Sequence, residues 1–336
     1  MPNNLTSHTN PGPHAVGLKQ LTVVDSENNG RTIPIDVWYP AVASDDLAAF
    51  PQADHPLRAP HNAQQNLVPA AGRFPLVLFS HGNSGYPQQS TFLTTHLASW
   101  GIVVAAPEHV GNTFTDSLKI DSEEKRKQVH FDARHNRPLD VAAAARAVLS
   151  HDGTLPAIDD SSIGALGHSF GGWTSLKMPG IDKNVRAVCG LAPASEPFVG
   201  RKAFEPGELP FAPSLPSLLI AGLDDVLVDV ETSIKPLHQR LGQSAALVGV
   251  ERADHFHFCD SVELLHGMHV ANKRPNQTRE TKPTDELLGE AEIHAILRAL
   301  VTSFFRSAFA ADIESPISHL TPNALTLLHQ TVRRIR

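Results

Sequence analysis

The chain has 336 residues, of which 41% are hydrophobic and 19% are charged. This composition is typical of a folded protein with a sizeable core and excludes global disorder. The formal net charge of -7 argues against a nucleic-acid partner, because binding phosphates needs a concentrated basic surface. We therefore expect one elaborated globular domain.

Apolar runs, the first residues and the cysteine count bear on cellular location and redox state. The sequence has no apolar run of about 18 residues, so we expect no transmembrane helix. Its first residues lack the basic and then apolar pattern of a signal peptide, which predicts a cytoplasmic protein unless a leader has been removed. Cys189 and Cys259 are too few for a disulfide scaffold; we expect free thiols, with a single bridge as the alternative. The oligomeric state stays open.

The apolar pattern along the chain predicts an α/β architecture. Residues 1–16 are polar and rich in proline and glycine, and β-rich runs at 18–24 and 32–39 look like a leading antiparallel pair. Further strands are expected at residues 75–79, 102–106, 163–166, 185–191, 217–221 and 245–250. Helices are expected at residues 88–100, 138–149, 230–241 and 286–309. This alternation predicts a mostly parallel sheet with helices on both faces and a site outside the carboxyl ends of its strands.

The pentapeptide Gly-His-Ser-Phe-Gly at residues 167–171 matches the G-x-S-x-G nucleophile elbow. An apolar strand runs directly into it, and a helix-like segment follows. A serine in a strained turn between strand and helix needs small residues two positions before and after it, so that the backbones can approach. The pattern predicts Ser169 as a nucleophile; an ordinary serine in a glycine-rich turn is the alternative.

A His-Gly turn at residues 81–82 ends the earlier strand at 75–79. Such a turn can present a backbone N–H to a substrate carbonyl oxygen as that oxygen gains charge. We expect the two donors of an oxyanion hole to be the backbone N–H groups of Asn83 and Phe170. The alternative is a tight loop that needs Gly82 only for its backbone angles.

The chemistry also requires a histidine base beside the serine and a carboxylate that orients it, and in this fold the chain order is serine, acid, histidine. Asp224 and Asp225 follow the strand at 217–221; we prefer Asp225 and keep Asp224 as the second choice. His255 is the first histidine after the last expected strand and is the predicted base. His257 would face the other way in an extended segment.

The chain has 19 histidines, so a lone histidine carries little weight. His266 and His269 have the spacing of metal ligands, but no cysteine or carboxylate cluster accompanies them, and we expect neither a metal nor another cofactor. His81 and His168 border the predicted site and are expected to pack rather than to react.

These motifs resemble those of the plasma-type platelet-activating-factor acetylhydrolases and of their bacterial dienelactone-hydrolase-like relatives. The similarity is carried by residues 79–82 (Phe-Ser-His-Gly), 108–109 (Glu-His), 167–172 (Gly-His-Ser-Phe-Gly-Gly) and 253–256 (Ala-Asp-His-Phe). It implies an α/β-hydrolase esterase with a serine nucleophile, the histidine base named above and the same two oxyanion donors.

One position departs from that family's pattern. The plasma-type enzymes carry their acid after the strand that here ends near Leu191, where Ala192 stands. The acid is therefore expected after the following strand, at Asp225, with Glu196 as a weaker candidate. Dienelactone hydrolases use a cysteine nucleophile, so Ser169 argues against that activity.

The expected organisation is a flexible N-terminal arm at 1–16, an α/β-hydrolase domain at 17–310 and a C-terminal helical extension at 311–336. The proline-rich segment 192–216 is too short for a large cap domain, which predicts an open cleft. We expect a serine carboxylic ester hydrolase that acts on small-molecule esters with short to medium acyl chains. The alternatives are a non-catalytic binding or interaction protein on the same fold, and another acyl chemistry such as transesterification, lactone or polyester hydrolysis.

Overall fold

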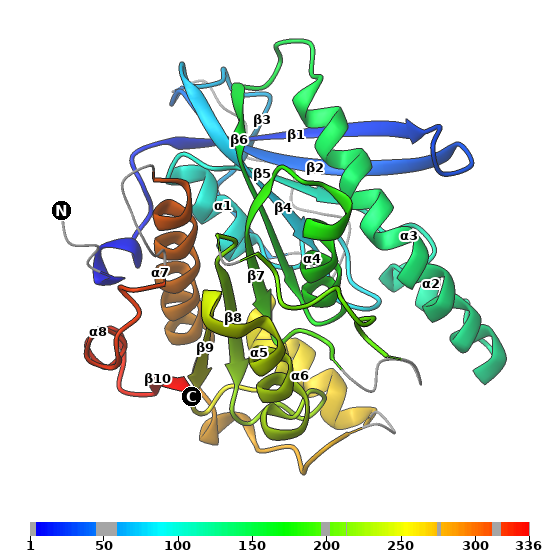
Figure 1. Cartoon of the computed structure of the whole chain (residues 1–336), viewed down its shortest axis with the longest axis vertical. Helices are drawn as coiled ribbons and strands as arrows, with labels where there is room; N and C mark the ends of the chain where they lie inside the picture. The colour runs from blue at the N-terminus through cyan, green and yellow to red at the C-terminus, as the bar shows by residue number, and fades with distance from the viewer. Residues whose placement is uncertain are drawn as a thin grey trace.

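A ten-stranded sheet forms the centre of the molecule (Figure 1). The structure is a computed structural model that describes residues 5–44, 59–195, 202–212, 214–273, 277–310 and 317–335. The strand order is β10-β9-β8-β7-β6-β4-β5-β2-β1-β3. The six strands from β5 to β9 in this order pair in parallel, and β2 pairs antiparallel with both β1 and β5. The structure thus confirms the predicted antiparallel pair and the mostly parallel sheet.

The strands are β1 (Ala15–Asp25), β2 (Arg31–Ala41), β3 (Gln64–Gln65), β4 (Arg73–Ser80), β5 (Val103–Pro107), β6 (Ala157–His168), β7 (Val185–Leu191), β8 (Ser217–Gly222), β9 (Ala245–Val250) and β10 (Val332–Ile335). The α-helices are α1 (Thr91–Ser99), α2 (Phe114–Ser117), α3 (Glu123–Leu149), α4 (Phe170–Ile181), α5 (Lys235–Leu241), α6 (Val262–Ala271), α7 (Glu290–Phe309) and α8 (Pro322–Leu328). Short helical turns are η1 (Leu5–His8), η2 (Val230–Ile234), η3 (Gly242–Ser244), η4 (His255–Phe258) and η5 (Thr284–Glu286).

Helices cover both faces of the sheet, as predicted (Figure 1). One apolar cluster joins the sheet to α3, α4 and α5 through side chains such as Val141, Trp173 and Leu237. A second cluster joins the opposite face to α1 and α7 through Leu97 and Leu297. In the described part of the segment 192–216 no helix forms, so no helical cap is built there. These layers are those of the α/β-hydrolase fold.

The two cysteines and the helices can be compared with the expectations of free thiols and of no transmembrane helix. Cys189 and Cys259 are both buried and form no disulfide, as the sequence predicted. Among the helices of the described residues, none combines the length and the apolar character that a membrane span requires.

Both chain ends differ from the expectation. Within the described part of residues 1–16, η1 forms with Leu5 buried, and β1 already begins at Ala15. At the other end, α8 is followed by β10, in which Val332 lies opposite Val250 of β9. The C-terminal extension is therefore partly an edge strand. Its buried Val332 and exposed Arg333 show the period-two alternation of a half-buried strand.

Helix α3 begins well before Pro138, where the sequence predicted its start. The Oγ of Ser122 accepts the N–H of Lys125 at 3.2 Å and caps the helix, and acidic residues occupy its first turn. The first half of α3 is mostly exposed, whereas Arg137 and Asp140 in the second half are fully buried. The first half of α3 thus lies in solvent, and its second half packs against the sheet.

Three buried histidines connect the outer helical segments to the rest of the protein: His8 in η1, His96 in α1 and His294 in α7. The Nε2 of His96 lies 2.9 Å from the carbonyl oxygen of His8, and that of His294 lies 2.9 Å from the carbonyl oxygen of Cys259. Burial is the largest cause that lowers the pKa of each of the three from 6.5 to about 4. Unfolding exposes these rings, so the unfolded chain binds more protons below pH 6.5 and stability falls as the pH drops toward 4.

We predict that acidification from about pH 7.5 to about pH 5 lowers the Tm by about 5 °C or more. Burial raises the pKa of Asp140 and of Asp260 to about 6, which opposes this trend between about pH 4 and pH 6. The histidines outweigh these two carboxyls, because burial also lowers the pKa of His81 and of His109 well below the usual value.

Thermal unfolding followed by circular dichroism at stepped pH measures this effect. The variant His294→Gln keeps a hydrogen-bond donor near the carbonyl of Cys259 but does not titrate, so its Tm should fall less steeply. A Tm that is constant or rises on acidification over this range would contradict the prediction.

Candidate active site

The nucleophile elbow lies between β6 and α4. Ser169 follows the last residue of β6 and precedes the first residue of α4, with a φ of 56° and a ψ of −117°. A non-glycine residue at positive φ costs of order 1–3 kcal/mol, so the surrounding structure must hold it. The N–H of Ser169 donates to the carbonyl of Leu191 at 2.9 Å, and its own carbonyl accepts the N–H of Ala194 at 2.8 Å. The predicted strained turn is therefore present.

The two flanking glycines are sterically required. A Cβ atom on Gly167 would lie 2.2 Å from the carbonyl oxygen of Gly171, and one on Gly171 would lie 1.8 Å from the carbonyl oxygen of Ser80. These contacts are with backbone atoms that cannot swing away. Small residues at both positions thus let the elbow pack against the end of β4, as the sequence pattern predicts.

The structure brings Ser169, His255 and Asp225 together. The hydroxyl of Ser169 lies 2.9 Å from Nε2 of His255, and Nδ1 of His255 lies 2.8 Å from Oδ2 of Asp225. Because the carboxylate can only accept, Nδ1 of His255 carries the proton and donates it to Asp225. The lone pair of Nε2 then accepts a hydrogen bond from the hydroxyl of Ser169. This is the histidine tautomer that a general base needs. The catalytic roles of the three residues stay a prediction.

The two neighbouring aspartates at the end of β8 have different surroundings. Asp225 is buried, and its Oδ1 accepts the N–H groups of Leu227 and Val228 at 2.7 and 2.8 Å. Asp224 points elsewhere: its Oδ1 lies 2.7 Å from Nζ of Lys282. The structure therefore places Asp225 beside the histidine and not Asp224. The weaker candidate acid, Glu196, lies outside the described residues.

Asp254 holds the short helix η4 that begins with His255. Its Oδ1 accepts the N–H of Phe256 at 2.9 Å and contacts Nδ1 of His257 at 2.7 Å, while its Oδ2 contacts Nδ1 of His266 at 2.6 Å. Hydrogen bonds from the two histidines hold the pKa of Asp254 below its usual value against the opposing effect of burial. The hydrogen bond to Asp254 raises the pKa of His266.

The contacts of Asp254 also account for two other histidines. His257 faces away from Ser169, because its Nε2 lies 3.1 Å from the carbonyl oxygen of Leu288. His266 belongs to the Asp254 cluster, and the part of the chain that the structure describes has no group of three or more His, Cys, Asp or Glu side chains suited to a metal.

The predicted oxyanion turn lies beside the elbow. Ser80, the last residue of β4, is in register with Gly167 of β6, so residues 81–83 continue next to the serine. The side-chain Oδ1 of Asn83 accepts hydrogen bonds at 3.0 Å from Nδ2 of Asn112 and from Nε2 of His130. Phe170 begins α4, where backbone N–H groups have no intrahelical acceptor. The role of these two backbone N–H groups as oxyanion donors stays a prediction.

A buried hydrogen-bond chain, which sequence reasoning missed, links the oxyanion turn to His255. The N–H of Gly82 donates to Oε1 of Gln89 at 2.9 Å, and Nε2 of Gln89 donates to Nδ1 of His168 at 3.0 Å. The Nε2 of His168 then donates to the backbone carbonyl of His255 at 3.0 Å. His168, expected only to pack, thus supports the base. The position of His168 next to Ser169 could have indicated this role from the sequence. Nothing in the sequence indicated the role of its partner Gln89.

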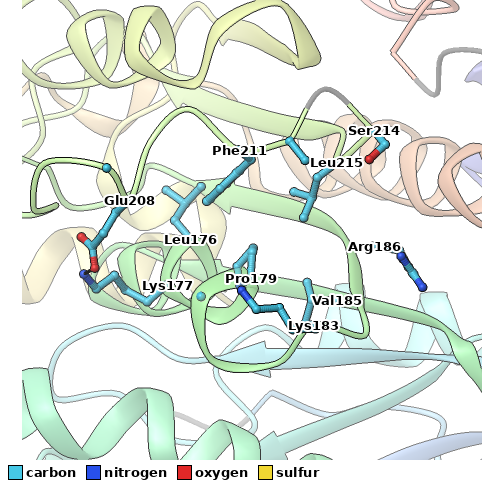
Figure 2. Close-up of a pocket in the computed structure, with 13 residues that line it drawn as sticks. Leu176, Lys177, Pro179, Lys183, Val185, Arg186, Glu208, Phe211, Ser214 and Leu215 are labelled. Atoms are coloured by element: carbon cyan, nitrogen blue, oxygen red, sulfur yellow. Dashed lines mark hydrogen bonds and ion pairs between the residues drawn. The ribbon is translucent and has the colours of Figure 1, made fainter.

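A separate cavity of about 530 Å³ lies away from these residues (Figure 2). Its lining includes Leu176 and Lys177 near the end of α4, Val185 at the start of β7, and Glu208 and Phe211. The start of β7 is the amino end of a parallel strand, whereas Ser169 follows the carboxyl end of β6. This cavity therefore lies at the opposite end of the sheet from Ser169.

Two comparisons with known proteins bear on the site. The family model described as platelet-activating factor acetylhydrolase, isoform II, matches residues 47–137. Among solved structures, a ferulic acid esterase from Streptomyces cinnamoneus is similar over 97% of this chain and 98% of that chain, with a TM-score of 0.70 and 22% sequence identity. The family match confirms the predicted resemblance over the matched stretch, and the structural similarity confirms the fold.

Proposed function

We propose that this chain is a serine carboxylic ester hydrolase that works through a Ser-His-Asp triad and an acyl-enzyme. The observation that carries the proposal is the hydrogen-bonded series of Ser169, His255 and Asp225 outside the carboxyl ends of parallel strands. The family match to acetylhydrolases and the similarity to a ferulic acid esterase support ester cleavage as the reaction.

In the acylation step, Nε2 of His255 takes the proton of Ser169 while Oγ attacks the ester carbonyl carbon. The carbonyl oxygen becomes an oxyanion, which the N–H groups of Asn83 and Phe170 stabilise. The imidazolium, whose Nδ1–H donates to Asp225, gives its proton to the departing alcohol. In the second step, water loses a proton to His255 and attacks the acyl-enzyme, which releases the acid and restores the serine.

The proposed substrates are small esters with short to medium acyl chains. Support comes from the segment 192–216, whose described residues build no helix that would wall a long acyl tunnel. We predict that kcat/KM for p-nitrophenyl esters is highest for acetate to octanoate and at least about tenfold lower for palmitate, since losing about 1.4 kcal/mol of binding in the transition state has this effect. A profile that is flat, or that rises toward palmitate, would refute the chain-length proposal.

The compartment is proposed to be the cytoplasm, with secretion after loss of a leader as the alternative. Two buried cysteines that form no disulfide fit a reducing compartment.

The rival function is that of a non-catalytic binding protein on the same fold. Turnover of any ester in the panel that depends on Ser169 would separate the esterase from such a binding protein.

A further inference from the structure

Arg137 of α3 carries a charge in the interior of the protein. Its side chain is fully buried, and within the described residues no carboxylate forms an ion pair with it. Asp140, one turn further along, is occupied by Nε of Arg31 at 2.7 Å and by Nδ1 of His109 at 3.0 Å. Burial lowers the pKa of Arg137 to about 9, which leaves the group cationic at neutral pH. Burying a charge costs several kcal/mol, so its other contacts must compensate.

Those contacts are concentrated on the oxyanion turn. The guanidinium of Arg137 donates to the carbonyl oxygens of His81 and Gly82, each at 2.7 Å, and Nε donates to Oδ1 of Asn112 at 2.9 Å. It also lies over the ring of Phe170 at 4.4 Å from the centroid. One buried cation thus contacts both peptide carbonyls that precede Asn83 and the side chain of the other predicted oxyanion residue.

The carbonyl of Gly82 belongs to the same peptide group as the N–H of Asn83. Because a trans peptide is planar, its C=O and N–H point in opposite directions. When Arg137 fixes the Gly82 oxygen, it also fixes the direction of the Asn83 N–H on the opposite side, away from the guanidinium. A cation at the carbonyl oxygen also polarises the peptide and makes its N–H a stronger donor.

His81 holds the same carbonyl from a second direction. Its Nε2 accepts the N–H of His109 at 3.2 Å, so the proton of the neutral ring lies on Nδ1 and is donated to the oxygen of Gly82 at 2.8 Å. Burial, followed by the nearby charge of Arg137, lowers the pKa of His81 well below its usual value and keeps this ring neutral. The N–H of Gly85 donates to the same oxygen at 3.1 Å, so the Gly82 carbonyl accepts three hydrogen bonds, and those from Arg137 and His81 are the two shorter ones.

A buried series of Ser80, His109 and Asp140 braces the end of β4. The hydroxyl of Ser80 donates to Nε2 of His109 at 2.8 Å, and Nδ1 of His109 donates to Asp140 at 3.0 Å. This is the connectivity of the proposed triad, but Ser80, His109 and Asp140 are 1%, 0% and 0% exposed, so no substrate reaches it. Its place directly before residues 81–83 makes it a support for the turn.

We propose that Arg137 is a positioning residue of the oxyanion hole: it binds the carbonyls of His81 and Gly82 and thereby aims and polarises the N–H of Asn83. This inference rests on the proposed ester hydrolysis. Its effect is confined to the transition state, because only there does the substrate oxygen carry the charge that the N–H stabilises.

Three variants test the proposal with p-nitrophenyl acetate. Arg137→Met removes the donors and keeps a long apolar stem, Arg137→Lys keeps the charge and a donor head, and Arg146→Met is the control. Arg146 lies on the same helix, is half-exposed, and pairs with the buried Asp25 and the exposed Glu27, away from the oxyanion turn. We expect Arg137→Met to lower kcat about 100-fold with KM changed less than about threefold. Arg137→Lys should recover at least about a tenth of the wild-type kcat, and Arg146→Met should stay within about twofold.

Hydrogen exchange read by mass spectrometry supplies a readout that does not need activity. In Arg137→Met, and more weakly in Arg137→Lys, peptides covering residues 80–89 should exchange faster, while those covering β8 and β9 should be unchanged. If Arg137→Met does not fold, the exchange of residues 80–89 in Arg137→Lys decides, and the kcat criterion that follows applies to Arg137→Met alone. The inference is overturned by a kcat within about threefold of wild type, by a loss confined to KM, or by unchanged exchange at 80–89.

Failure of the proposed function has a different signature from failure of this inference. If the wild type hydrolyses no ester, the ester-hydrolase proposal fails, and the exchange of residues 80–89 alone then decides whether Arg137 holds the turn. If the wild type is active and the Arg137 variants keep both kcat and exchange, only the role of Arg137 is refuted.

Discussion

Replacing Ser169 by Ala should lower kcat for p-nitrophenyl butyrate at least about 10⁴-fold, because loss of the nucleophile removes the acyl-enzyme route altogether. The Tm should stay within about 2 °C of that of the wild type. Ala keeps the Cβ atom, so the backbone strain at a φ of 56° is unchanged. The variant loses only the hydroxyl that lies 2.9 Å from His255. Steady-state kinetics measure the effect, and circular dichroism verifies that both proteins are folded.

Labelling with a fluorophosphonate provides the control for this variant. The probe should modify the wild type on a peptide that contains Ser169 and should leave Ser169→Ala unlabelled. Ser80 should stay unmodified in both, although it also contacts a histidine, because it is 1% exposed. Turnover in Ser169→Ala within tenfold of wild type, or labelling at another serine, would end the proposal of a Ser169 nucleophile.

The elbow could be predicted from the sequence because its requirements are local. Gly167 and Gly171 must be small to avoid backbone atoms at 2.2 and 1.8 Å, and the apolar run before them forms β6. The sequence signature of these requirements lies within five consecutive residues and the strand before them, although the backbone atom that Gly171 must avoid belongs to Ser80 of β4. The alternation of apolar runs likewise predicted the central sheet, because strands buried on both faces read as continuous apolar segments.

The support of the oxyanion turn could not be predicted, because it depends on which charges of α3 face inward. The run from Lys119 to Arg137 is rich in charged residues of both signs, a composition that favours a solvated helix face. In the structure, Ala133, Arg137, Asp140, Val141 and Ala144 are all buried and recur at the spacing of one helix face. The position of Arg137 within that stripe could have indicated that its side chain faces the core. The rule that arginine is rarely buried argued against this, but it fails here because backbone carbonyls accept the N–H groups of the guanidinium.

The strand β10 is a second element that the sequence analysis did not predict. Three arginines near the C-terminus are compatible with the helical extension expected at 311–336, yet Val332 to Ile335 pair with β9. Edge strands often carry charged side chains on the side that faces water, so composition alone favoured the wrong element. The alternation of buried Val332 with exposed Arg333 becomes informative only once a neighbouring strand with an unpaired edge is known.

The choice between Asp224 and Asp225 can be tested by matched substitutions. Chain order left both open, and the turn after β8 directs only Asp225 toward His255. Asp225→Asn should lower kcat about 10⁴-fold, as expected when an orienting carboxylate is lost. Asp224→Asn should stay within about twofold, because it removes an ion pair with the half-exposed Lys282, and the amide oxygen of Asn can still accept the N–H of Arg252, which Oδ2 of Asp224 accepts at 3.1 Å.

The physical reason for the large effect lies in the two N–H groups that bind Asp225. In Asp225→Asn, the amide oxygen takes the position that accepts the N–H groups of Leu227 and Val228, so the NH₂ group faces Nδ1 of His255. Nδ1 must then accept a hydrogen bond, the ring proton moves to Nε2, and Nε2 can no longer take the proton of Ser169. Burst kinetics with p-nitrophenyl acetate should show that acylation is the slowed step. An equal loss in both Asn variants, or a loss below tenfold in Asp225→Asn, would move the acid to another residue.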